Sequence, residues 1–305
     1  RVDGAWNTII RIENDGTQDV DILCYWMDGN KHRVDFILPI TINQPVWFDA
    51  KNGQGSPAGN LFPTGGANGF DNPFLITPPA TTEETDTGGP HLRGLLACWA
   101  VDNTATNQVK WNHLSGTATV YDGAAAYEYN AYAFFVPSGT DLQPVGTAGV
   151  LRLNGLEYDA CPQYQIAQFA SGVTAQSRRL AMVSCKLFLN QDWIPVYTKY
   201  VFDAWNADDV KLTGAFRCAD SWHESPSGTD PTLSTGIRYR VQGVQSTQCL
   251  VDGVQVPTEE VGVIAVQSME LVNRGYVGST LTAAGKRNGE IRWDPSFMIP
   301  EGGIE

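Results

Sequence analysis

Basic residues are scarce in this sequence: 20 lysines and arginines stand against 33 aspartates and glutamates, which gives a formal net charge of −13. The basic residues form no cluster, whereas a nucleic-acid surface needs lysine and arginine gathered on one side to neutralise phosphates. The same lack argues against binding to an anionic membrane surface. We therefore expect no nucleic-acid partner, and acidity of this kind keeps an exported protein soluble.

Long apolar runs are also missing. No run approaches the roughly 20 residues of a membrane-spanning helix, so we expect no membrane span. Asn-x-Ser/Thr acceptors are absent, which favours a bacterial source for an exported chain. The sequence begins at Arg1 rather than methionine, as expected after removal of a signal peptide.

Motifs for catalysis are lacking too. No GxSxG elbow, Walker loop, HExxH, or GxGxxG followed by a helix occurs. The four histidines show no metal-ligand spacing; they are His32, His91, His113 and His223. The carboxylates that are adjacent in the sequence would point to opposite faces of a strand, whereas a glycosidase needs two carboxyls facing each other at roughly 5–9 Å. These pairs are Glu83–Glu84, Asp208–Asp209 and Glu259–Glu260. We expect no enzymatic activity.

Oxygen-rich turns leave a structural calcium ion open as an alternative to having no cofactor. Asn206, Asp208 and Asp209 form one such turn, and residues 28–30 (Asp-Gly-Asn) form the other. Neither has the EF-hand spacing, and Asp and Asn are also ordinary β-turn residues.

The six cysteines are dispersed, even in number and free of CxxC motifs; they are Cys24, Cys98, Cys161, Cys185, Cys218 and Cys249. We predict three disulfides in an oxidising compartment, with an extracellular or cell-surface location. Six buried thiols in a cytosolic protein are the alternative. Fifteen pairings are possible. We expect Cys24–Cys98 and Cys185–Cys218, which leaves Cys161–Cys249.

Alternating apolar and polar residues dominate the chain and predict an all-β fold. Residues 8–13 read as a strand, 14–16 as a turn and 20–26 as the partner strand. Further strands are expected at 34–42, 45–49, 92–101, 114–121, 127–136, 180–189, 196–204, 210–218, 237–243 and 261–272. Short strands of this spacing indicate two immunoglobulin-like β-sandwich domains. We place the first at residues 1–155, with an inserted loop at 51–90, and the second at 156–305, with an extended tail at 286–305.

The Gly/Pro-rich loop and the tail carry apolar side chains that a simple linker would not. We expect a neighbouring copy to cover them, through contacts at Phe62, Phe70, Phe74, Trp293, Phe297 and Met298. The first hypothesis is thus a subunit of a homopolymeric surface assembly, as a filament, tube or layer. The alternative is a cell-surface binding module for a glycan or a protein, because Trp side chains can also form a sugar-binding platform. The candidates for such a platform are Trp26, Trp47, Trp99, Trp111 and Trp205, for which packing inside a sandwich is the simpler explanation.

Several segments resemble those of known exported proteins. Residues 8–16 (TIIRIENDG), followed by Cys24 and by residues 36–39 (FILP), resemble the opening of bacterial immunoglobulin-like surface domains. Residues 111–119 (WNHLSGTAT) and 153–162 (LNGLEYDACP) resemble uncharacterised secreted immunoglobulin-like all-β proteins of environmental anaerobic bacteria. The resemblance implies export and an all-β fold, and it carries no catalytic residues.

Overall fold

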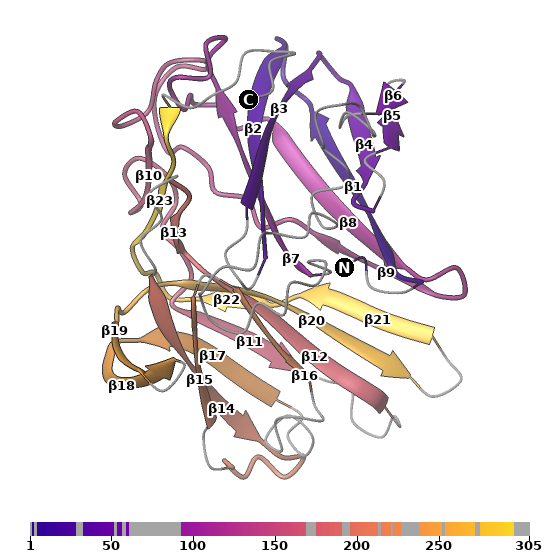
Figure 1. Ribbon diagram of the computed structural model, residues 1–305, viewed down its shortest axis with the longest axis vertical. Helices are drawn as coiled ribbons and strands as arrows, with labels where there is room; N and C mark the ends of the chain where they lie inside the picture. Colours follow the sequence, from indigo (N-terminus) through magenta and orange to yellow (C-terminus); the bar gives the residue numbers. More distant parts are fainter. Residues whose placement is uncertain are drawn as a thin grey trace.

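The computed structural model describes residues 2, 5–28, 33–51, 54–56, 59–60, 93–168, 175–190, 196–212, 215–220, 222–226, 238–251, 254–271 and 275–295. This part of the chain contains 23 β-strands and no α-helix, so the predicted all-β class is confirmed (Figure 1). No helix among these residues is long and apolar enough to cross a membrane.

The N-terminal half builds two sheets. Sheet 1 has the order β6-β5-β4-β1-β8-β9, and sheet 2 has the order β3-β2-β7. The bounds of their strands are β1 (Asn7–Asn14), β2 (Val20–Asp28), β3 (Arg33–Ile40), β4 (Pro45–Asp49), β5 (Gln54–Ser56), β6 (Gly59–Asn60), β7 (Gly94–Val101), β8 (Leu114–Tyr121) and β9 (Ala126–Asn130). Ile12 and Phe48 of sheet 1 pack against Ile22 and Trp26 of sheet 2 in one apolar core. The two sheets therefore form a sandwich.

Strand β2 is not the hairpin partner of β1, so that prediction is wrong. β1 pairs with β4 and β8, whereas β2 pairs with β3 and β7 in the other sheet. The turn between them is fixed by Asn14, whose Oδ1 accepts hydrogen bonds from Gly16 N and from Trp111 Nε1, both at 3.0 Å. β2 is buried on both faces, with Ile22 in one core and Leu23 in the next. A strand with two apolar faces is stable only as a middle layer, which is why the chain changes sheets here.

The C-terminal half builds a second sandwich. Sheet 4 has the order β15-β14-β17-β11-β22, sheet 5 the order β16-β12-β20-β21, and β18 and β19 form a separate hairpin. The bounds of these strands are β11 (Tyr164–Gln168), β12 (Ala175–Ser184), β14 (Tyr197–Trp205), β15 (Ala215–Asp220), β16 (Trp222–Pro226), β17 (Arg238–Val244), β18 (Ser246–Val251), β19 (Val254–Thr258), β20 (Val263–Leu271), β21 (Gly275–Thr280) and β22 (Thr282–Ala284). Tyr200, Phe202 and Tyr239 of sheet 4 pack on Leu180 and Met182 of sheet 5.

A third core lies between the two sandwiches. Sheet 3, of order β10-β23-β13, joins β10 (Val150–Leu153), β13 (Lys186–Phe188) and β23 (Gly289–Arg292). Its residues pack with Leu23 and Trp99 of sheet 2 and with Ile264 of sheet 5. This middle core contains residues from both sides of the predicted boundary at 155. The immunoglobulin-like character and the two-domain division stay predictions.

The described part of the tail is covered by the chain itself. β23 pairs antiparallel with β10 and parallel with β13. Trp293, only 1% exposed, packs at a ring distance of 5.8 Å from Trp99. The expectation that Trp293 would need a neighbouring copy to cover it is therefore wrong, because the middle core of the same chain buries it.

All six cysteines form disulfides, and no described cysteine is free. Cys24–Cys98 is the pair we expected, whereas the other two bonds are Cys161–Cys185 and Cys218–Cys249, so those predicted pairings are wrong. Cys161 and Cys185 both lie in the middle core, while Cys218 on β15 reaches the β18–β19 hairpin. Cys24 and Cys98 lie opposite each other in one sheet, unlike the inter-sheet disulfide of antibody domains. Three disulfides indicate an oxidising compartment.

Candidate interaction surface

The predicted assembly contacts divide into two groups. Trp293 is buried, as described above. Phe62, Phe70, Phe74, Phe297 and Met298 lie outside the described residues. Among the tryptophans considered for a sugar platform, Trp26, Trp99 and Trp111 are core residues. Only Trp47 and Trp205 of that group are partly exposed, on sheet 1 and sheet 4 respectively.

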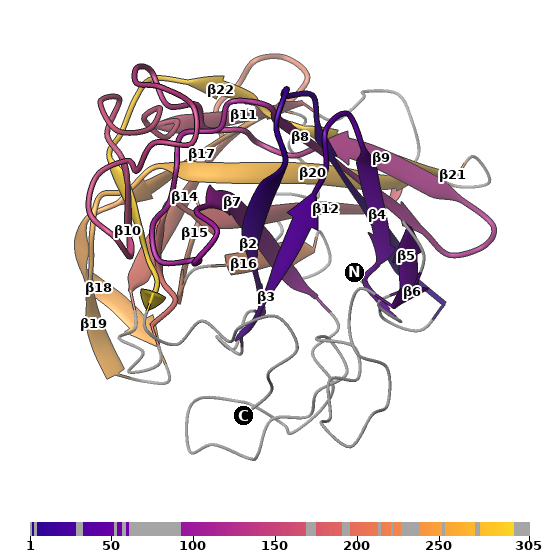
Figure 2. The ribbon, with the colours of Figure 1, turned by 90° about the horizontal axis from the view of Figure 1, so that it is seen from above.

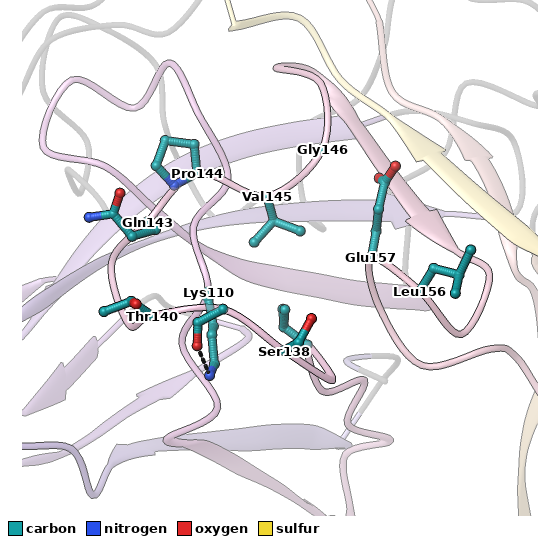
Figure 3. Close-up of a pocket in the computed structure, with 11 residues that line it drawn as sticks. Lys110, Ser138, Thr140, Gln143, Pro144, Val145, Gly146, Leu156 and Glu157 are labelled. Atoms are coloured by element: carbon teal, nitrogen blue, oxygen red, sulfur yellow. Dashed lines mark hydrogen bonds between the residues drawn. The ribbon is translucent and has the colours of Figure 1, made fainter.

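A shallow hollow lies beside the connection from β9 to β10 (Figure 3). Leu156 and Glu157 line one side of it, and Gln143 and Pro144 line the other. Its volume of about 210 Å³ is below the roughly 300–1,000 Å³ of small-molecule sites. Two of its charged groups make contacts within the chain: Lys110 Nζ donates to Gly139 O at 2.5 Å, and Arg152 donates to Glu157 Oε1 at 3.0 Å. Glu157 Oε2, the other oxygen of this carboxylate, is buried and has no hydrogen-bond partner in the structure.

The candidate catalytic groups are held by structural contacts. His113 bridges two loops, with Nδ1 3.2 Å from Asp15 Oδ1 and Nε2 3.3 Å from Asp141 Oδ2. Glu259 and Glu260 turn to different cations, Lys186 at 2.5 Å and Arg287 at 2.6 Å. They do not face each other across a cleft. The side chain of His223, and the residues His32, His91, Glu83 and Glu84, lie outside the described part of the chain.

The calcium-like turn after β14 is stabilised by its own backbone. Asn206 Oδ1 accepts hydrogen bonds from Asp208 N and Val210 N, both at 2.9 Å. Asp209 forms an ion pair with Arg238. No group of three or more metal-ligating side chains occurs among the residues described. The side chains of the second calcium candidate, residues 28–30, lie outside them.

The outer face of sheet 4 carries exposed aromatic and apolar residues. Along β14, Tyr200 and Phe202 point into the core, so Val201 and Trp205 point outward. The strand register places Phe216 of β15 opposite Val201, and Ile166 of β11 opposite Arg240. Both residues therefore lie on this outer face. Phe216 is 48% exposed and Ile166 is 44% exposed. The sheet therefore presents a broad surface at the lower end of the molecule in Figure 1.

Three cations of this face each lie over an aromatic ring of the same face. Lys199 Nζ is 4.2 Å from the ring centre of Phe216, the Arg240 guanidinium is 4.9 Å from that of Tyr164, and Lys211 Nζ is 5.9 Å from that of Trp205. We call the surface formed by these residues with Val201, Ile166 and Arg238 the cation–aromatic face. A cation held over a ring is attracted to its π face and is already partly ordered. Such a face suits a partner that offers both apolar surface and negative charge.

Asp203 organises two of these cations. It lies between Lys211, at 2.8 Å, and Arg240, whose Nε donates to Asp203 Oδ2 at 3.1 Å. Burial of Asp203 alone would raise the pKa of this carboxyl, but hydrogen bonds from Lys211 and Arg240 outweigh burial and hold the pKa below its usual value. The ionised carboxylate therefore stabilises the folded sheet at neutral pH.

Asp203→Asn should lower the free energy of unfolding by about 1–2 kcal/mol at pH 7, between the values for exposed and buried ion pairs. Because the folded pKa is below the unfolded value, this stabilisation is complete above the ordinary value of 3.8 and is lost as the pH falls through the folded pKa. Urea unfolding at pH 7 and at several values below 3.8 would check this, and the difference between the wild type and the variant should shrink as the pH is lowered. The exposed Asp208→Asn is the control; an equal loss in both variants at pH 7 would contradict the role given to Asp203.

The β18–β19 hairpin is fastened to one end of the cation–aromatic face. Cys218, beside Lys199 in the β14–β15 register, is bonded to Cys249 of β18. Thr258 Oγ1 donates to Val244 O at 2.9 Å, which ties β19 to the end of β17. The disulfide and this hydrogen bond fix the hairpin relative to the sheet.

Sequence reasoning did not identify Lys199, Phe216, Tyr164 or Arg240 as surface residues. The alternation in β14 contained the signal for one face, because odd-numbered residues from Lys199 to Trp205 lie on one side of the strand. The hairpin was also missed, although the dipeptide Asp252-Gly253 lies between its strands and is a strong hairpin signal. Assigning β11 and β17 to the same face required the register of the folded sheet.

Comparisons of the chain with protein-family models, with curated proteins and with solved structures found no match.

Proposed function

We propose that this chain is a non-catalytic extracellular structural protein that acts by binding a macromolecular partner through the cation–aromatic face. The observation that carries the proposal is the set of three cation–ring pairs on one open sheet face, with Phe216 and Ile166 about half exposed beside them. Exposed apolar residues gathered on one face are typical of interaction sites. The three disulfides support a location in an oxidising compartment. A role as a subunit of a homopolymeric surface assembly agrees with these features.

A glycan-binding module is the second candidate, because aromatic rings on an open sheet face can stack on sugars. Here Lys199 and Arg240 lie over rings, so the part of each ring available to a neutral sugar is reduced. Acidic sugars would instead meet cations that are already positioned. This candidate therefore predicts binding of acidic glycans in preference to neutral ones.

The double variant Ile166→Ser/Phe216→Ser tests the proposed function. Each side chain is about half exposed, and covering an apolar side chain contributes about 1 kcal/mol for half its surface. We expect the variant to weaken association at least tenfold, whether the partner is a second copy or an acidic glycan. Sedimentation velocity and a glycan array would measure the two kinds of association.

Trp47→Ser is the matched control, since Trp47 is a partly exposed aromatic on the outer side of sheet 1. It should leave association unchanged. The proposed function would be contradicted by a wild-type protein that associates with nothing in either assay, or by an Ile166→Ser/Phe216→Ser variant that binds as well as the wild type.

A further inference from the structure

The cation–aromatic face differs in charge from the rest of this acidic chain. Four cations lie on it or in its β14–β15 turn: Lys199, Lys211, Arg238 and Arg240. Asp203, Asp208 and Asp209 accompany them, and the β14–β15 register places Asp220 on the same face, opposite Tyr197. Four positive and four negative charges make the face neutral, in a protein whose total is −13. The face therefore lacks the negative excess of the whole chain, and its cations can meet the carboxylates of a partner.

The strand ends at the far side of the first sandwich form a strongly acidic surface, which we call the acidic end. It consists of Glu13, Asp15, Asp19, Asp21, Asp102 and Asp141. Lys110 is the basic residue among them, 3.7 Å from Asp141, so six carboxylates and one ammonium give a net charge of −5 with His113 neutral. Ile42, which is 48% exposed, adds an apolar side chain to this surface, and its backbone N donates to Asp19 at 3.0 Å.

These residues come together because of strand direction. Asp15 and Asp19 lie in the turn from β1 to β2. Asp21, near the start of β2, pairs with Val101 at the end of β7. The loop that starts at Asp102 therefore leaves sheet 2 at the same end as this turn. Asp141 reaches this end through His113. The acidic end is thus fixed by five separate chain segments rather than by one loop.

The acidic end and the cation–aromatic face lie at opposite ends of the molecule. The other end of β1, at Asn7, pairs with Tyr121 next to β9, and Tyr127 of β9 lies against Gly278 of β21 in sheet 5. Sheet 5 separates this contact from sheet 4. Figure 1 shows the first sandwich above sheet 5 and β14 of sheet 4 below it, and Figure 2 shows the molecule from above. One surface therefore points away from the other along the long axis.

From this arrangement we propose that the partner of the cation–aromatic face is the acidic end of a second copy of this chain. The proposal rests on the proposed function and names its partner. Opposite charges meet, and Ile42 of one copy faces the apolar residues Phe216 and Ile166 of the next. Because the two surfaces differ and lie at opposite ends, each added copy leaves one of each free. Such a head-to-tail contact does not close on itself and builds a filament.

Ionic strength should control this contact in two directions. Without salt, the net charge of −13 on every copy opposes association. At about 0.1 M salt the Debye length is roughly 10 Å, so whole-molecule repulsion is screened while touching groups still interact. At 1 M salt the length falls to about 3 Å and the local attraction weakens. Association should therefore be strongest near 0.1 M.

Two charge-reversed variants test the proposal. Glu13→Lys/Asp15→Lys changes the acidic end, and Lys199→Glu/Arg238→Glu changes the cation–aromatic face. Each alone should weaken self-association roughly tenfold or more, since exposed charge pairs are individually weak but here turn from attractive to repulsive. Glu128→Lys, an exposed acid on β9 outside both surfaces, is the control and should associate as the wild type does. Circular dichroism would confirm that each variant is folded.

Mixing the two reversed variants gives the decisive result, because each still carries one unchanged surface that fits the other. At a concentration where each variant alone is monomeric, an equimolar mixture should form heterodimers by sedimentation velocity. A mixture that stays monomeric, or an acidic-end variant that associates like the wild type, would overturn the head-to-tail assignment. If the Ile166→Ser/Phe216→Ser variant still lost binding to an acidic glycan, the proposed function would stand with a different partner.

Discussion

Replacing Trp293 with alanine is expected to lower the free energy of unfolding by about 3–5 kcal/mol, the range for deleting a large buried aromatic side chain. Trp293 is 1% exposed and packs on Trp99 in the middle core, and its backbone N donates to Gly149 O at 3.0 Å. The ring therefore joins the returning C-terminal segment to sheet 2. Loss of it leaves a cavity where the two sandwiches meet. Urea unfolding followed by tryptophan fluorescence and by far-UV circular dichroism would measure the change.

Trp47→Ala is the matched control for this variant, because Trp47 has the same side chain but is 39% exposed on β4. Its effect should stay within about 1 kcal/mol, as for surface substitutions. Equal stability losses in the two variants would mean that the middle core does not depend on Trp293.

Removing the Cys24–Cys98 disulfide by the double substitution Cys24→Ala/Cys98→Ala should cost about 4 kcal/mol. In the chain-entropy account a disulfide stabilises by restricting the unfolded chain, and the effect grows with the loop that it closes. The two cysteines are separated by 74 residues, the longest of the three separations. They also join the two strands of sheet 2 that bound both the first core and the middle core. Chemical denaturation under non-reducing conditions would measure the loss.

Cys161→Ala/Cys185→Ala provides the comparison, since this bond spans only 24 residues. The chain-entropy account predicts a cost smaller by about 1 kcal/mol. A larger cost for the shorter loop would show that packing of Cys161 and Cys185 in the middle core matters more than loop length. Peptide mapping without reduction would verify the three pairings in the wild type.

The sequence pattern predicted most strands well, because apolar and polar residues alternate along a strand that has one buried face. β14 is such a case: Thr198, Tyr200 and Phe202 are buried in turn. The prediction for β2 was wrong because the turn at residues 14–16 resembles a hairpin turn. Both faces of β2 are in fact buried, so the strand belongs to a different sheet from β1. Whether a turn returns to the same sheet or crosses to another depends on distant residues, here Trp111, and no local pattern shows that.

Pairings between distant strands and cysteines could not be predicted from the sequence, because they also depend on residues far apart in the chain. Cys161 meets Cys185 because β23 returns between β10 and β13 to complete the middle core. β11 was overlooked because its inward positions include Gln165, buried to 1% where an apolar residue would be expected. The candidate surface likewise depends on register, which places Arg240 of β17 next to Asp203 of β14 and Ile166 of β11. Composition could exclude a broad basic surface, but it could not show where four cations gather.

The features of the chain combine into one physical account. Three disulfides and three cores make a rigid β-sheet body. A rigid body holds the acidic end and the cation–aromatic face in a fixed relation, so repeated copies would stack with a constant geometry.

Sedimentation velocity of the wild-type protein over a concentration series at about 0.1 M salt tests this account most directly. The account predicts an average mass that rises with concentration and falls again at 1 M salt, with single-file particles by electron microscopy of the same samples. A single species of 33.2 kDa at every concentration and both salt levels would contradict it.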